Sequence, residues 1–145
     1  MRKSSRFRKR SVGEQEAERN AFKSGKQVRL MIRVAFGASG ALGPGKIQLM
    51  ELIEEHGSIT AASAAMGMSY RRAWVLLKSL NEAFKDEVVA TKHGGNKGGG
   101  ARLTPFGQTL LARYQGILDT ANAAVADELE ALEQDFIEWA KTPAD

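Results

Sequence analysis

The chain has 145 residues, a formal net charge of +4 at pH 7, two histidines and no cysteine. This length suits one domain with tails, and the lack of cysteine excludes disulfides, zinc–thiolate sites and thiol catalysis. We expect no metal and no cofactor, because two histidines are too few for a histidine-based site. The longest apolar run, residues 30–36, is too short to span a bilayer, so no membrane partner is expected.

The charges are unevenly distributed along the chain. Residues 1–24 are basic, polar and without periodicity, which predicts a flexible arm. Because no apolar signal core follows this basic start, we expect a cytoplasmic protein. Residues 25–118 contain the predicted domain, and residues 119–145 are strongly acidic. The modest basic excess favours anionic partners without naming one.

The first predicted elements are a strand and a helix. Residues 27–36 alternate between apolar and polar side chains, as a strand does. A glycine-rich break follows, and from Pro44 the apolar residues recur at helical spacing. Glu51 is expected on the polar side of this helix. Gly57 is expected to end the helix at the C′ position.

Two further helices follow in quick succession. Ser58 is predicted to cap the second helix, which Gly67 ends after two turns. Ser69 is predicted to cap the third, which extends to about Phe84. A short helix, a tight glycine turn and a second helix with basic residues in its first turn indicate a helix-turn-helix.

The last elements are a hairpin and a long helix. Residues 87–92 and 101–103 are predicted strands on either side of a glycine-rich loop. Thr104 caps a fourth helix with Pro105 at N1, and this helix is expected to run to about Trp139. The predicted fold is therefore mainly α with a small β-hairpin wing: a winged helix-turn-helix with a long C-terminal dimerisation helix.

The segment from Gly40 to Lys46 fits the spacing of a phosphate-binding loop, G-x-x-x-x-G-K. Ile47 follows where such a loop has the Ser or Thr that binds magnesium, and no second strand ends in a suitable Asp. We interpret the segment as a strand-to-helix turn and keep nucleotide binding as an alternative. No nucleophile–base set or carboxylate pair is found, so the chain is not expected to be an enzyme.

The third helix carries cations on the face that we expect to point outward. Arg71, Arg72, Val75 and Lys78 lie on this face, and the first turns of such a helix normally enter the major groove of DNA. Arginine donates a fork of hydrogen bonds to guanine O6 and N7 or to a phosphate. An ordinary solvated face is the competing interpretation.

Tyr70 and Trp74 raise a separate question. Their i, i+4 spacing with Leu77 favours packing in the core over contact with DNA.

The glycine-rich loop is expected to bring cations close to DNA. Glycine allows the backbone to approach a surface, while lysine and arginine displace counterions from phosphates. A flexible, solvated loop tip is the alternative. The residues expected to bind DNA are Ser58, Thr60, Ser69, Arg71, Arg72, Val75, Lys78, Lys92, Asn96, Lys97 and Arg102.

Two segments resemble a known family. "GSITAASAAMGMSYRRAWVLLKSLNEAF" (57–84) and "GGNKGGGARLTPFGQTLLARY" (94–114) are similar to the winged-helix DNA-binding domain of ModE-type molybdate-responsive regulators, which are related to LysR-type regulators. The similarity covers about residues 28–118 and implies DNA binding and transcriptional control. Members of that family continue into a molybdate-binding domain, whereas this chain stops at Asp145, so molybdate is not expected to bind.

The fourth helix carries apolar residues at a seven-residue step, as partner helices do. We expect a homodimer; the alternative is that the first half packs on its own domain and the second half is an acidic tail. The expected dimerisation residues are Leu111, Leu118, Val125, Leu129, Leu132, Phe136 and Trp139.

The sequence thus predicts a dimeric, sequence-specific regulator that binds double-stranded DNA. A non-specific architectural DNA-binding protein remains the main alternative, because the chain is small and has a basic arm. The two differ in how strongly a particular site is preferred over random DNA.

Overall fold

The computed structural model describes residue 14, residues 28–92 and residues 100–140, with side chains through Phe136. Apart from Glu14, the expected basic arm lies outside these residues, as does the tip of the glycine-rich loop. The chain divides into two compact units, one of Ile32–Tyr114 and one of Met1–Met31 with Gln115–Asp145. The domain boundaries predicted from sequence remain predictions.

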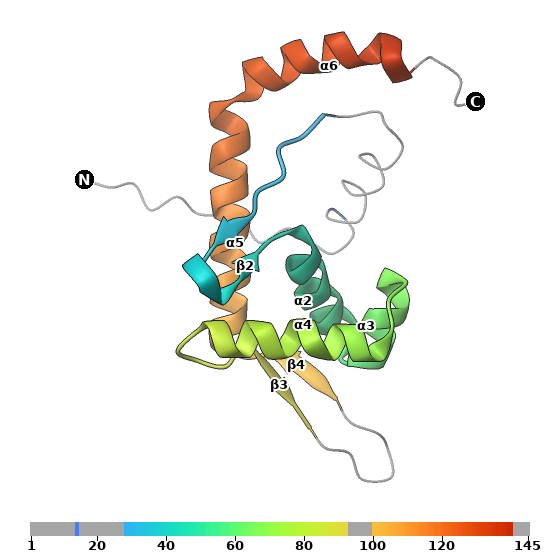
Figure 1. The fold of residues 1–145 in the computed structure, drawn as a ribbon, viewed down its shortest axis with the longest axis vertical. Coiled ribbons are helices and arrows are strands. Elements are labelled where there is room, and N and C mark those ends of the chain that lie inside the picture. The colour runs from blue at the N-terminus through green and yellow to red at the C-terminus, as the bar shows by residue number, and fades with distance from the viewer. Residues whose placement is uncertain (1–13, 15–27, 93–99, 141–145) are drawn as a thin grey trace. The chain divides into compact units, whose positions relative to one another are not determined.

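The described residues are mainly helical, with two short antiparallel hairpins (Figure 1). This confirms the predicted winged helix-turn-helix, with α3 and α4 as the helix pair and β3–β4 as the wing. None of the helices in this part of the chain is long and apolar enough to cross a membrane. The elements are β1 (Val34–Ala35), the 3-10 helix η1 (Gly37–Ser39), β2 (Ala41–Leu42), α2 (Pro44–His56), α3 (Ile59–Met66), α4 (Tyr70–Ala83), β3 (Val89–Thr91), β4 (Ala101–Leu103), α5 (Pro105–Ala124) and α6 (Ala126–Ala140).

Helix α2 is the centre of the Ile32–Tyr114 unit. It begins with Pro44 at its first position and ends at Gly57, whose φ of 66° is left-handed, as the sequence predicts. It packs against α3, α4 and β4. Because neighbours surround it, its middle is buried on nearly every side, and Glu51 is buried as well. The expected polar face at Glu51 is therefore wrong.

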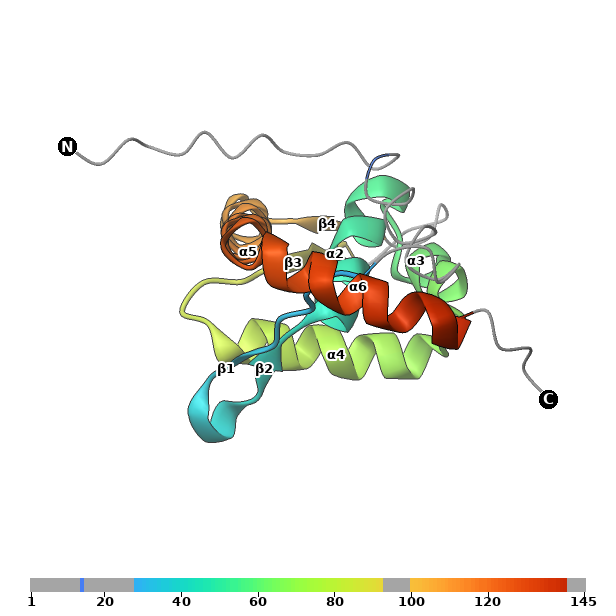
Figure 2. The ribbon, with the colours of Figure 1, turned by 90° about the horizontal axis from the view of Figure 1, so that it is seen from above.

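The helix pair forms as the capping residues predict. Ser58 Oγ accepts a hydrogen bond from the Ala61 amide at 3.2 Å, and Ser69 Oγ accepts one from the Arg72 amide at 3.1 Å. Gly67 ends α3 with a φ of 68°. In Figures 1 and 2, α3 lies beside the N-terminal end of α4, and β2 lies beside the other end.

The wing joins directly to α5. In the wing, Val89 pairs with Leu103 and Thr91 pairs with Ala101. The Thr104 amide donates to the Val88 carbonyl at 3.0 Å, and Thr104 Oγ1 caps α5 by accepting from the Gly107 amide at 2.9 Å. The first turn of α5 therefore rests on the backbone at the base of β3.

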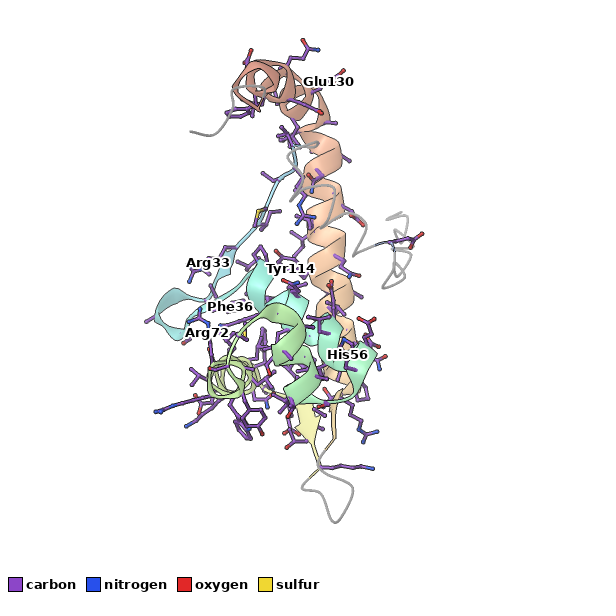
Figure 3. The ribbon with its side chains drawn as sticks, turned by 90° about the vertical axis from the view of Figure 1, so that its right-hand side faces the viewer. Arg33, Phe36, His56, Arg72, Tyr114 and Glu130 are labelled. Atoms are coloured by element: carbon purple, nitrogen blue, oxygen red, sulfur yellow. The ribbon has the colours of Figure 1, made fainter. Side chains whose placement is uncertain are left out.

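Aromatic rings close one side of the unit. The ring of Phe84, just after α4, lies 5.2 Å from that of Phe36 and 5.6 Å from that of Phe106, measured between ring centroids. Tyr114, buried on α5, donates its hydroxyl proton to the Ile32 carbonyl (Phe36 and Tyr114 are labelled in Figure 3). These contacts fix the start of the unit and the end of α4 against α5.

The single long C-terminal helix expected from the sequence is wrong in one respect. A turn at Val125 separates α5 from α6, so the seven-residue stripe is not one continuous line. Leu111 is only 2% exposed and packs in the core of its own unit, which excludes it from a dimer surface. The seven-residue spacing misled at Leu111 because the first part of α5 packs in the core of the domain.

The expected strand 27–36 is reduced to the two residues of β1. The Leu30 amide instead donates to Asn122 Oδ1 at 3.1 Å, and Asn122 Nδ2 donates to the Leu118 carbonyl at 2.7 Å. Side-chain exposure still alternates along this segment. Most of it makes no strand-to-strand hydrogen bonds, because β2 pairs only with Val34 and Ala35.

We predict that Gly107→Ala destabilises the protein by about 3 kcal/mol. A Cβ at this position would lie 2.2 Å from the Val88 carbonyl oxygen, which is backbone and cannot move without shifting β3. Gly45→Ala is the matched control, because nothing lies within 4 Å of its added methyl group and α2 should gain up to about 1 kcal/mol. Urea denaturation measures both; equal midpoints for the two variants would contradict the close approach at Gly107.

Candidate nucleic-acid interface

Helix α4 has one buried side and one broad exposed side. Ala73, Leu77 and Leu80 are buried at positions i, i+4 and i+7, which defines the face that meets the domain core. The exposed side carries Arg71, Arg72, Val75 and Lys78. The structure thus leaves every predicted contact residue of this helix accessible, while their contacts with DNA remain a prediction.

The expected burial of Tyr70 and Trp74 is wrong. Their side chains are 50% and 40% exposed, and the Trp74 indole Nε1–H donates to the Tyr70 hydroxyl at 2.7 Å. The spacing misleads because the core contacts α4 along Ala73, Leu77 and Leu80, a line rotated away from both rings. Tyr70 and Trp74 therefore form an aromatic pair on the accessible surface of α4.

Asn81 connects α4 to the wing. Its Oδ1 accepts hydrogen bonds from the Val88 amide at 2.9 Å and the Val89 amide at 3.1 Å, and its Nδ2 donates to the Val89 carbonyl at 3.2 Å. One half-buried side chain satisfies three backbone groups where β3 begins. The orientation of the wing relative to α4 depends on this amide.

A second anchor holds the other wing strand. The Ala101 amide donates to the Gly57 carbonyl at 2.9 Å, and Lys92 donates its amide to the Gly100 carbonyl at 2.8 Å. Strand β4 is thereby attached to the turn between α2 and α3. Lys92 and Arg102 are exposed on the wing (Figure 1 shows β3 and β4 extending together beyond α4). Asn96 and Lys97 lie outside the described residues.

The remaining predicted contact residues lie at the starts of helices. Ser58 and Ser69 use their hydroxyl oxygens as caps, so each fixes the backbone of its helix before any ligand arrives. Thr60 is exposed in the first turn of α3. Backbone amides at such a helix start are suited to an anion.

Lys46 does not point to a nucleotide. Its Nζ donates to the Ala41 carbonyl at 2.8 Å and to Ser79 Oγ at 3.1 Å, so it joins β2 to α4 within the domain. The turn before α2 is a structural support in this arrangement. In the part of the chain that the structure describes, no group of three acidic, histidine or cysteine residues is placed to hold a metal ion.

The cations on α4 are held only weakly within the protein. Lys78 Nζ lies 3.8 Å from Glu82 Oε1, and both side chains are well exposed. Exposed ion pairs of this kind contribute little to stability, so Lys78 can exchange its partner for a phosphate at small cost.

Comparison with known proteins agrees with this geometry. Residues 45–108 match the model of a family described as bacterial regulatory helix-turn-helix protein, lysR family. Over these residues the chain is similar to the helix-turn-helix domain of that family. The match includes α3, α4 and both strands of the wing.

The relatives of this domain confirm the resemblance to ModE-type regulators. The chain is 38% identical over 89 residues to the molybdenum-pterin-binding protein MopA of Rhodobacter capsulatus, covering 61% of this chain and 33% of that protein. It is 35% identical over 77 residues to the molybdenum transport protein ModE of Azotobacter vinelandii, covering 53% and 28%. It is 37% identical over 71 residues to the DNA-binding transcriptional dual regulator ModE of Escherichia coli (strain K12), covering 49% and 27%.

These similarities apply to the helix-turn-helix part of each relative. The chain spans about a third or less of the length of the curated relatives that it matches. None of these three relatives is named as an enzyme. The molybdenum in their names is a property of those proteins.

Sequence reasoning overlooked Asn81. Its neighbours Leu77 and Leu80 are buried, so a polar residue at the edge of this apolar side is a signal that a backbone partner lies nearby. The signal does not identify that partner, because the three bonded groups come from residues seven and eight positions later.

We predict that Asn81→Ala costs about 1–3 kcal/mol, because it leaves the Val88 and Val89 amides without their acceptor. Hydrogen exchange at these two amides should accelerate more than exchange within α2. Asn81→Asp, which keeps both acceptor bonds but loses the donor to the Val89 carbonyl, should protect the two amides better than alanine does. Glu82→Ala, which breaks only the exposed ion pair, is the control; equal exchange in Asn81→Ala and Glu82→Ala would contradict the anchor.

Proposed function

We propose that this chain is a sequence-specific, DNA-binding transcription regulator that acts as a homodimer. The observation that carries the proposal is the exposed cationic side of α4, in a helix-turn-helix whose wing is fixed to the same helix by Asn81. The family match and the regulator among the relatives support it. A cytoplasmic location accords with this function.

Helix α4 is the recognition helix in this proposal. Its first turns enter the major groove, where Arg71 and Arg72 donate to guanine O6 and N7 or hold a phosphate. Lys78, two turns later, contacts a phosphate, and Val75 contacts base edges. The start of α3, with Ser58 and Thr60, binds a backbone phosphate on the adjacent strand.

The wing supplies contacts that depend little on sequence. Lys92, Lys97 and Arg102 neutralise phosphates by their charge, and Asn96 donates a hydrogen bond to a phosphate oxygen. The two anchors at Asn81 and Gly57 hold the wing base against the recognition unit. Base contacts therefore set specificity, while wing contacts raise affinity for any duplex.

The homodimer rests on exposed apolar residues in the unit that includes α6. Leu132 and Phe136 are 45% and 53% exposed, and Leu129 lies on the same face of the helix. Leu118 and Val125 are half-buried earlier along the chain, and the Trp139 side chain lies outside the described residues. A second copy of the chain would cover this surface and place two recognition helices on two half-sites.

We predict that the intact chain binds a duplex selected from a random library about a thousandfold more tightly than a shuffled duplex of the same composition. Where a guanine contact is lost, Arg71→Ala or Arg72→Ala should reduce the difference in binding free energy between the two duplexes by about 1–3 kcal/mol. Fluorescence anisotropy titrations at several salt concentrations measure both affinities.

Arg102→Gln is the control for these variants. It should weaken binding to both duplexes equally. It should also lower by about one the slope of log affinity against log salt concentration. A ratio near one for the intact chain would favour the architectural alternative. Equal losses on both duplexes in the α4 variants would make Arg71 and Arg72 phosphate contacts rather than readers of sequence.

We predict that replacing Leu132 and Phe136 together by aspartate produces monomers, because two charges would be placed on the apolar face of α6. Gln134→Asp adds the same kind of charge on the opposite, exposed side of the helix and should leave the dimer intact. Sedimentation equilibrium at micromolar concentration measures the mass, and anisotropy measures the weakened binding of the selected duplex. An intact chain that is monomeric yet binds that duplex specifically would refute the dimer.

A further inference from the structure

Tyr70 and Trp74 occupy the flank of α4 that faces the wing. At about 100° per residue, Tyr70, Trp74 and Asn81 lie along one strip of the helix, and Asn81 bonds to the start of β3. The other flank carries Ser79, which bonds to Lys46 near β2. The aromatic pair therefore lies between the exposed crest of α4 and the side on which the wing is attached.

The hydrogen bond within the pair gives each ring a different surface. The Trp74 Nε1–H, the only polar group of the indole, is used by the Tyr70 hydroxyl oxygen at 2.7 Å. The exposed part of the indole is therefore carbon. The Tyr70 hydroxyl accepts this bond, which leaves its own proton to be donated outward.

The charges around the pair indicate the chemistry of its partner. Arg71, Arg72 and Lys78 are exposed on the same helix, and the first turn contains no acid. An apolar ring beside a concentration of positive charge suits a partner that is anionic and also offers apolar groups. Duplex DNA offers both in one groove, because thymine presents its C5-methyl group beside the phosphate backbone.

We propose that Trp74 reads thymine by packing its indole on the C5-methyl group, and that Tyr70 donates its hydroxyl proton to a phosphate oxygen. This inference rests on the proposed function and adds two residues to it. The hydrogen bond between them keeps the two rings side by side on one flank of α4, so both contacts are made from that flank. Trp74 is thus a specificity residue, and Tyr70 is a phosphate contact.

The test uses the full chain and the duplex recovered by selection. Each thymine of that duplex is replaced in turn by deoxyuridine, which removes only the methyl group. At one or more positions the intact chain should bind about fourfold more weakly, as expected when one methyl group is no longer buried. In Trp74→Ala the same replacements should have no further effect, because the indole that senses the methyl group is gone.

Two variants separate the roles of the two rings. Trp74→Phe keeps an aromatic surface without the N–H and should retain sensitivity to uracil. Tyr70→Phe should weaken the selected and shuffled duplexes equally, by about tenfold for a hydrogen bond to a charged acceptor. Its salt slope should stay unchanged, because a neutral hydroxyl releases no counterion, in contrast to Arg102→Gln.

The outcomes distinguish this inference from the proposed function. If the intact chain does not prefer the selected duplex, the proposed function fails. If it does, but no thymine is sensitive to uracil, or Trp74→Ala retains the full sensitivity, only the assignment of Trp74 is overturned. The comparison of the selected and shuffled duplexes needs only the intact chain. Thermal unfolding of Trp74→Ala should match that of the intact chain, since the side chain it removes lies outside the core.

Discussion

The position of the wing depends on one amide side chain. Asn81 accepts from two consecutive backbone amides and donates to a carbonyl of the same strand, so it replaces a stretch of sheet pairing that β3 lacks on that side. Val88 and Val89 are almost completely buried, and unpaired amides there would be costly. Because the amide is carried by α4, a shift of α4 would be transmitted to the wing.

Glycine permits the other close contacts at the base of the wing. Gly107 lets α5 begin against the Val88 carbonyl, and Gly100 lies close to the Gly57 carbonyl where β4 is attached. Each contact joins backbone to backbone, so these close approaches add to the Asn81 side chain in fixing the base of the wing. A wing fixed in this way presents Lys92 and Arg102 at set distances from α4, which favours contact with phosphates in a defined register.

Local signals predicted the helix boundaries well, whereas burial depended on neighbours that the sequence does not reveal. Ser58, Gly67 and Ser69 act within one turn of themselves, and the structure confirms each. Trp74 and Glu51 were misplaced because apolar spacing shows that a helix has a face without showing where the core meets it. Val125 was missed because no proline or glycine marks the break between α5 and α6.

The first turn of α4 favours an anionic partner on electrostatic grounds. Arg71 and Arg72 lie where the helix dipole is positive, and the first turn of α4 contains no acid; each such placement costs about 0.3–1 kcal/mol near a surface. Neither arginine is needed by the core, since both are exposed. A phosphate or the acceptor edge of guanine would reverse the sign of this interaction, since it would meet two cations and the helix dipole together. The two arginines that destabilise the isolated helix would therefore interact most favourably with the negatively charged groove of DNA. This electrostatic attraction does not depend on the base sequence in the groove.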